Sequence, residues 1–456
     1  SVTFKNELGF SELSNTVTTS NSHNYNLASD WESAKGKYTK YAGVNYPSDF
    51  NGSNYQNVTG GRTASADEYS DNPYGVYYDN QNLFFRTGVD RTLYTSLSTS
   101  NDNTNVYFSA ENQKNEGIAR DTKGYERNAI RLNVDFKVNN WLKFSSKTNF
   151  IKRVNKSSGG MDLFGLTLAE SDVNLFANNP DGQPYQLIPN LWAATVSNPL
   201  YSLYKGDPVA LTNTYLGAYS ANIKLADWLS LDAEYTLEVA NGRSESYFGK
   251  DYYTGGGPQS NLYSQYSTGS MSKSSYFSLS QKTQFTANLT KSWEDLTIKG
   301  RLSYLLEDAH YESFYGSGSN LIYAGVKSLD NFDKANTNIS SSYNDQRAKN
   351  AFAILGLDYK DRYIFDGMFR MDGSSLFGEN HRWNNYYRVS GAYRISKDFD
   401  IPGVQELKIH AALGTAGQRP GFSWQYDRIS LSGGGLSTQR TQSNPDLLPS
   451  ETTELE

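Results

Sequence analysis

Cysteine is absent from the 456-residue chain, which excludes disulfide scaffolds, thiol nucleophiles and cysteine-bound metals. No stretch reaches the roughly 18 consecutive apolar residues that a membrane-spanning helix needs. Histidine occurs only 4 times, and no two histidines have the spacing of a metal-binding pair. No Gly-x-Ser-x-Gly elbow or phosphate-cradling loop is present. We therefore predict that the protein is not an enzyme.

The chain also has no excess of positive charge, with 42 Lys and Arg against 48 Asp and Glu. The net charge is −6 and the isoelectric point is about 5.5, so the sequence has no electrostatic signature of nucleic-acid binding.

The first residues lack the basic start and apolar core of a signal peptide, and we expect the chain to begin inside a mature protein.

Aromatic residues are abundant by contrast. They make up 14% of the chain, with 35 tyrosines and 22 phenylalanines, yet the mean hydropathy is −0.65. A transmembrane β-barrel reconciles these values, because only every second residue of a strand must be apolar.

Strict alternation of polar and apolar residues recurs along the chain. Even positions from Ile130 to Val138 are apolar, and odd positions from Arg131 to Lys137 are polar or charged. Alternation of this kind predicts strands with one apolar face. Similar pairs of alternating segments occupy 215–237, 285–304, 351–371 and 384–413, and a tight turn joins the first three pairs.

The connections between these segments alternate in length. Short turns are predicted near 100–103, 139–141, 226–228, 291–295 and 360–362, and long loops near 11–89, 114–126, 153–213, 240–276, 308–346 and 373–383. Short turns at one rim and long loops at the other are typical of outer-membrane barrels. We count about thirteen strands of roughly 10–13 residues, from 1–10 to 406–415. A soluble β-sandwich also alternates, but its strands are usually about five or six residues long.

One segment resembles a known family. Tyr363 to Gly378 reads YIFDGMFRMDGSSLFG and is similar to the Arg-x-Asp-Gly-Ser-Ser-x-Phe-Gly barrel signature of SusC/RagA-type TonB-dependent transporters. Further similar stretches follow the order of that family: Phe85–Gly88, Glu116–Ile118, Asn380–Trp383, Ser390–Ser396, Glu406–His410, Gly414–Gln418, Asn444–Leu447 and Glu451–Glu454. The chain departs from the pattern at Thr99-Ser100, where the family often has Gly-Gly, and at Gln418, where it has Asn.

The resemblance implies an all-β, antiparallel transmembrane barrel of twenty-two strands with an N-terminal plug that carries a TonB box. Residues 1–456 would then be a partial barrel without the plug and the C-terminal strands. It also implies a multi-pass protein of the bacterial outer membrane that imports a nutrient, most often an oligosaccharide. Peptide import of the RagA kind and a structural or adhesive barrel are the alternatives. An outer-membrane hydrolase is a remote third, with His381 as its one candidate base.

Several partners are implied in the same way. These are a SusD-like surface lipoprotein, the TonB–ExbB–ExbD system acting through the plug, membrane lipid with lipopolysaccharide, and a second transporter–lipoprotein pair that completes a dimer. No cofactor is expected. Asp67, Glu68, Asp71 and Asp79 form an acidic cluster that could hold structural Ca²⁺, although a solvated loop explains it as well.

Two groups of candidate substrate-binding residues remain. Alternation places Asp366, Arg370 and Asp372 on one face of a strand. This face must line the lumen, because an Arg side chain in the middle of the lipid bilayer costs roughly 2–4 kcal/mol of free energy. We expect Arg370 and Asp372 to pair with plug or wall residues rather than touch substrate, and Gly373 to begin a turn.

The second group consists of aromatic residues in the long loops: Tyr185, Trp192, Tyr252 and Tyr253, with Tyr263 and Tyr266 nearby. Such rings could stack on sugars, or could pack the loops against one another.

Overall fold

The computed structural model describes residues 1–20, 78–120, 122–156, 198–250, 268–425 and 446–456, with shorter stretches within 22–73, 163–184 and 428–444. Among these residues, no helix has the length and apolar character needed to cross a membrane.

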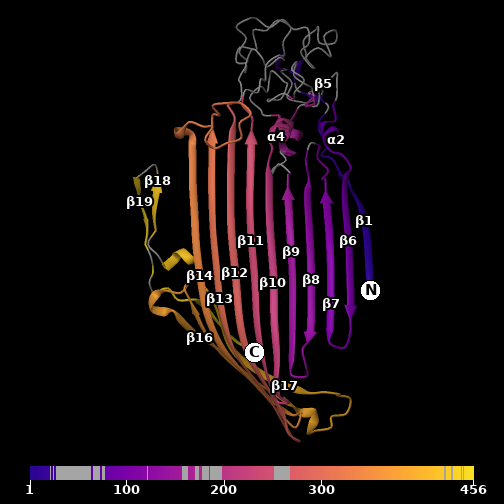
Figure 1. Ribbon diagram of the computed structural model, residues 1–456, viewed down its shortest axis with the longest axis vertical. Helices are drawn as coiled ribbons and strands as arrows, with labels where there is room; N and C mark the ends of the chain where they lie inside the picture. The colour runs from indigo at the N-terminus through magenta and orange to yellow at the C-terminus, as the bar shows by residue number, and fades with distance from the viewer. Residues whose placement is uncertain are drawn as a thin grey trace.

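One antiparallel sheet of 14 strands dominates the structure (Figure 1). Its spatial order follows the chain order, and each strand pairs with the next in the sheet. The strands are β1 (Val2–Ser11), β6 (Gly88–Ser100), β7 (Thr104–Asn115), β8 (Tyr125–Lys137), β9 (Leu142–Asn155), β10 (Val209–Ala226), β11 (Leu229–Phe248), β12 (Ser270–Ser292), β13 (Leu296–Ser319), β14 (Thr337–Tyr359), β15 (Tyr363–Ser374), β16 (Trp383–Arg394), β17 (Lys408–Gln418) and β20 (Ser450–Leu455). The predicted all-β, antiparallel fold is confirmed.

Small elements accompany the sheet. They are the helices α2 (Asn80–Phe84), α3 (Leu163–Leu168) and α4 (Pro199–Lys205), the hairpin β18 (Arg428–Ser432) with β19 (Gly435–Thr441), and the short pairs β2 (Ser22–His23) with β5 (Asn72–Pro73) and β3 (Tyr25–Asn26) with β4 (Thr63–Ala64). At the long-connection end, Phe84, Leu166, Leu175 and Leu200 form a buried cluster that joins the three helices. Burial of this apolar surface fixes the connections to one another at the base of the loops.

The five predicted tight turns lie at one end of the sheet, at the bottom of Figure 1. Trp141, Trp228 and Trp293 lie at three of these turns, with 53%, 44% and 54% of their surface exposed. At the same end Tyr363 stacks on Tyr393, with ring centroids 5.0 Å apart. Exposed aromatic rings at a rim are typical of the girdle at a membrane interface.

Strand length and strand number differ from the prediction. Strands β10 to β14 contain 18, 20, 23, 24 and 23 residues, about twice the expected length. The upper half of each strand, toward the long-connection end, carries polar residues on both faces. Backbone pairing between the strands therefore continues beyond the point where hydrophobic alternation stops. The fourteenth strand, β20, was missed for the same reason, because its sequence SETTEL has no apolar face.

Candidate functional site: the inner wall of the barrel

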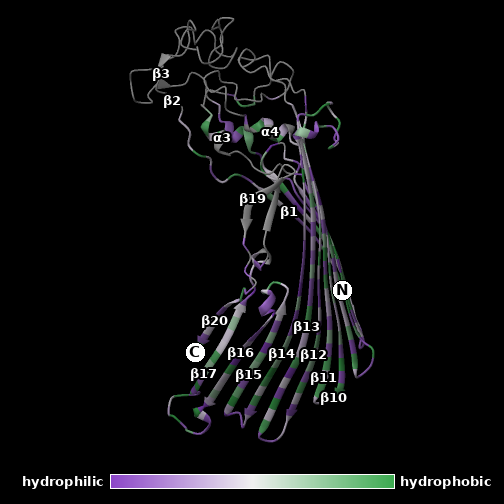
Figure 2. Cartoon of the chain, turned by 90° about the vertical axis from the view of Figure 1, so that its left-hand side faces the viewer, coloured by the Kyte–Doolittle hydropathy of each residue, from purple (hydrophilic) through white to green (hydrophobic). Residues whose placement is uncertain are grey.

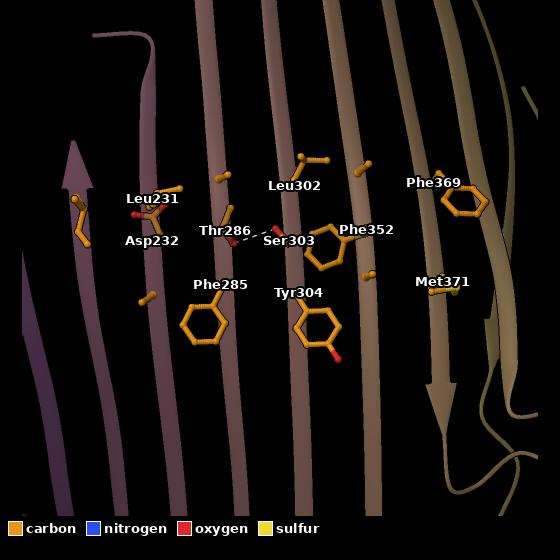
Figure 3. Close-up of a pocket in the computed structure, with 15 residues that line it drawn as sticks. Leu231, Asp232, Phe285, Thr286, Leu302, Ser303, Tyr304, Phe352, Phe369 and Met371 are labelled. Atoms are coloured by element: carbon orange, nitrogen blue, oxygen red, sulfur yellow. Dashed lines mark hydrogen bonds between the residues drawn. The ribbon is translucent and has the colours of Figure 1, made fainter. Parts of the chain in front are cut away.

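The pairing of the strands determines which side chains share a face. Residues directly opposite in an antiparallel ladder point to the same side, and Leu231, Ala287 and Leu302 are opposite one another. Phe285, Leu302 and Phe369 are 53%, 57% and 53% exposed (Figure 3). Since this apolar face suits lipid, the alternate residues line the inside of the barrel. Figure 2 shows the resulting alternation along the lower strands.

Arg370 and Asp372 both lie on the inner face of β15. The Nε of Arg370 donates to Oδ1 of Asp372 at 2.6 Å. The Asp372 residue is only 7% exposed, and it lies opposite Asn350 in the ladder. The two predicted residues therefore pair with each other within the wall, and their part in binding remains a prediction.

Gly373 was expected to begin a turn, and this was wrong. It lies within β15, and its backbone is not left-handed. A Cβ atom here would come within 2.6 Å of the Trp383 ring. Glycine is needed because the indole of the next strand covers this position.

Beside this pair lies an inner-wall cluster of Glu307, Asn350 and Arg419. Arg419 donates through Nη2 to Oε2 of Glu307 at 2.7 Å, and Nδ2 of Asn350 donates to the same oxygen at 3.1 Å. Asn350 is fully buried at 0% exposure. Sequence reasoning missed this cluster, because 112 residues separate Glu307 from Arg419 and Arg419 follows the end of β17, a strand that does not pair with β13.

The upper inner wall of β11 to β14 carries no charged side chain. Pairing here runs without a register shift, so alternation identifies every inward residue. On β11 and β12 they are Ala240, Gly242, Ser244, Ser246, Phe248, Ser270, Ser272, Ser274, Tyr276, Ser278 and Ser280. On β13 and β14 they are Ala309, Tyr311, Ser313, Tyr315, Ser317, Ser319, Asn338, Ser340, Ser342, Asn344 and Gln346. This surface, called here the hydroxyl wall, offers hydroxyl and amide groups but no fixed charge.

Aromatic rings lie on the hydroxyl wall. Tyr276 stacks on Tyr311, with centroids 6.3 Å apart and 24° between the planes. Gly242 lies beneath the Tyr276 ring, where any Cβ would collide with it. The hydroxyl groups of Ser313 and Ser342 are hydrogen-bonded at 2.7 Å. Rings that lie flat among hydroxyl groups suit a polyhydroxylated ligand.

An ion cluster joins three connections at the long-connection rim. The Nζ atoms of Lys123 and Lys327 lie 2.8 and 2.6 Å from the two carboxylate oxygens of Asp207. Hydrogen bonds from both ammonium groups lower the pKa of Asp207 from 3.8 to about 2. The cluster ties the β7–β8 and β13–β14 connections to the residues that precede β10.

The other predicted site residues fall elsewhere. Tyr185, Trp192, Tyr252, Tyr253, Tyr263 and Tyr266 lie outside the described residues, as do Asp67, Glu68 and Asp71. Asp79 is described, and its side chain caps α2 by accepting from the backbone N–H of Asn82 at 3.0 Å. Within the described part of the chain, no group of three or more His, Asp or Glu residues could hold a metal ion.

The chain resembles known proteins at low sequence identity. No family model matches the chain. It is 20% identical over 331 residues to the TonB-dependent receptor P26 of Formosa agariphila, covering 71% of this chain and 32% of that receptor. It is also 20% identical over 397 residues to receptor P39 of the same organism, covering 80% and 36%.

A solved structure has the same fold. The RagAB peptide importer in its closed-closed state superposes with a TM-score of 0.73 at 19% identity, over 100% of this chain and 52% of that chain. The chain has the barrel fold of a SusC/RagA-type TonB-dependent transporter. The resemblance drawn from sequence is therefore confirmed, and the relatives are receptors rather than enzymes. The chain spans about a third of the length of those curated relatives and about half of the solved importer.

Proposed function

We propose that the chain forms barrel wall in an outer-membrane transporter that imports an oligosaccharide with energy from the TonB–ExbB–ExbD system. The TonB-dependent receptors that resemble it support the mode of transport. A SusD-like lipoprotein would cover the rim of long connections, and two transporter–lipoprotein pairs would form the dimer. Because the chain matches only part of its relatives, these statements concern the whole transporter.

The hydroxyl wall is the observation that favours an oligosaccharide. A neutral sugar chain offers many hydroxyl groups and apolar ring faces, which serine hydroxyls and tyrosine rings match without desolvating a charge. The tyrosine pair Tyr276–Tyr311 lies on this wall with its rings stacked. The wall is on the long strands, toward the rim through which an external solute enters.

Peptide import is the second candidate, because the superposed RagAB structures are named as a peptide importer. Peptides carry charged termini and side chains, which favour ionic partners. In the described part of the inner wall, such partners lie lower, around Glu307 and Arg419. A peptide would therefore be bound below the hydroxyl wall rather than on it.

The test is growth of cells that carry the full-length transporter with Tyr276→Ala and Tyr311→Ala together. Defined oligosaccharides or defined peptides serve as the sole nutrient. We expect uptake of at least one oligosaccharide to fall about tenfold, since stacking on a ring contributes roughly 1 kcal/mol or more. A matched control is Tyr343→Ala, which removes an exposed tyrosine from the outward face of β14.

Three results would contradict the oligosaccharide proposal. Unchanged growth on every glycan in a strain lacking the gene would overturn it. Loss of peptide uptake alone would favour the RagA-like alternative. Normal uptake of all nutrients in the deletion strain, with altered cell-surface adhesion, would favour a structural or adhesive barrel.

A further inference from the structure

Three tyrosine rings lie in a row along the hydroxyl wall, on strands that reach the long-connection end of the sheet (Figure 1). Tyr276 on β12 is directly opposite Ser313, which lies between Tyr311 and Tyr315 on β13. The rings therefore begin at three successive heights, with Tyr311 lowest and Tyr315 highest. Four residues separate the outer two, or roughly 13 Å at about 3.3 Å per residue. This row is called here the tyrosine track.

The rings of the track leave apolar surface open to the lumen. Tyr276 and Tyr311 are nearly parallel, with 24° between their planes, and their centroids are 6.3 Å apart. Rings at this separation are offset, so each leaves much of the other uncovered. Tyr311 and Tyr315 are 42% and 41% exposed. A long ligand lying along the strands would therefore meet one ring after another.

Gly242 determines how Tyr276 lies. It is opposite Tyr276 in the ladder and is buried beneath the tyrosine ring. A Cβ atom at Gly242 would come 2.7 Å from Cζ and 2.9 Å from Cδ1 of that ring. Any larger residue would therefore lift or turn the ring away from the wall. The flat orientation of Tyr276 depends on glycine at this position.

Pairs of serines border the track on both sides. Toward β11, the Oγ atoms of Ser244 and Ser274 are hydrogen-bonded at 2.7 Å. Toward β14, the Oγ atoms of Ser313 and Ser342 are hydrogen-bonded at the same distance. Each bond uses one of the two hydroxyl hydrogens, so each pair keeps a donor and lone pairs for a ligand. The track thus has apolar faces along its middle and hydroxyl groups along its edges.

Inward charges lie around the track rather than within it. Below it, the nearest ones on β11, β12 and β13 are Glu238, Lys282 and Glu307. To one side, Arg153 on β9 is two strands away from Gly242, or roughly 10 Å. A ligand that contacts the rings and the serines meets no fixed charge, which suits an uncharged chain.

We propose that the tyrosine track selects flat, linear glycans of equatorially linked pyranose rings, such as β-1,4-linked hexose chains. This inference rests on the proposed import of an oligosaccharide. In such a chain the ring faces carry C–H groups and the hydroxyl groups project from the ring edges. The faces therefore match the tyrosines, and the edges match the serines. An α-1,4-linked chain bends at each linkage, so its successive rings do not lie along one row. Gly242 is the positioning residue of this site.

The test measures the binding of matched hexasaccharides to the full-length transporter in mild detergent by isothermal titration calorimetry. The β-1,4-linked hexamers of glucose, mannose and xylose are the flat probes, and the α-1,4-linked hexamer of glucose is the bent probe. We expect at least one flat probe to bind about tenfold more tightly than the bent one. Gly242→Ala should reduce this ratio about fivefold, because the lifted ring interrupts the track.

Gly356→Ala is the matched control. Gly356 is also an inward glycine, on β14, but a Cβ atom there would have its nearest neighbour, Oδ2 of Asp366, at 3.6 Å. The ratio should stay within about twofold of the wild type. A folding defect lowers the binding of both isomers alike, so the ratio separates positioning from stability. If Gly242→Ala does not fold, Tyr276→Ala removes the ring without crowding the wall and should also lower the ratio about fivefold.

Equal or tighter binding of the bent probe would overturn the proposal, as would the absence of binding by all three flat probes. An unchanged ratio in Tyr276→Ala would overturn it too. Oligosaccharide import would still stand in these cases if a strain lacking the gene lost growth on another glycan. Normal growth of that strain on every glycan would instead overturn the proposed function itself.

Discussion

The two halves of strands β11 to β14 distribute charge in opposite ways. In the lower half the outward residues are apolar, and inward residues such as Asp232, Lys282 and Glu307 are charged. In the upper half the inward hydroxyl wall is neutral, while ion pairs such as Lys273–Glu245 lie on the outward face. In both halves alternate residues face outward. These outward residues contact lipid in the lower half and water in the upper half. The comparison indicates that the upper strands extend beyond the hydrocarbon layer.

The largest test of this comparison places one arginine in each half of β14. Leu355→Arg puts a cation on the outward face in the middle of the apolar belt, and Ser341→Arg puts one on the outward face of the upper half. We expect Leu355→Arg to cost roughly 2–4 kcal/mol of folding free energy and Ser341→Arg close to none. Denaturant titration of the full-length protein in lipid vesicles measures both. Equal costs would mean that the boundary between the halves is misplaced.

The next test compares an inner cluster with an outer pair. Arg419→Met removes the guanidinium that donates to both Glu307 and the buried Asn350, and we expect a loss of about 1–3 kcal/mol. Lys273→Met breaks a half-exposed outward pair with Glu245 and should cost less than about 1 kcal/mol. Denaturant midpoints of the two variants measure the difference. Adding Glu307→Gln to Arg419→Met should recover part of the loss; full additivity of the two changes would exclude their coupling.

Sequence reasoning located the strands best where lipid imposes alternation. The tight turns and the inward orientation of Arg370 and Asp372 follow from that pattern, because one face must exclude polar groups. The upper halves of the long strands could not be predicted in this way. With water outside, a run such as Ser272 to Ser280 satisfies the backbone ladder without any hydrophobic period. The Glu307–Arg419 contact joins β13 to the residue that follows β17, four strands along the sheet, and no local pattern encodes such a contact.

The smallest expected effect concerns the rim above both halves, where Asp207 joins Lys123 and Lys327. The two ammonium groups lower the pKa of Asp207 from 3.8 to about 2. The folding free energy that this cluster contributes is therefore complete above about pH 4 and is lost as the pH falls toward 2. At neutral pH, Asp207→Asn should cost only about 0.2–1 kcal/mol, the value of a partly exposed pair.

That loss should be local. We expect faster hydrogen–deuterium exchange in the β13–β14 connection of Asp207→Asn, with the strand cores unchanged, because only the tie between connections is removed. Asp330→Asn is the control, since Asp330 is an exposed carboxylate of the same connection. Wild-type exchange should be the same at pH 7 and pH 5 after correction for the intrinsic rate. If the connection loosens already at pH 5, another group with a higher pKa holds it, and the Asp207 cluster is not the tie between the upper strands and the rim.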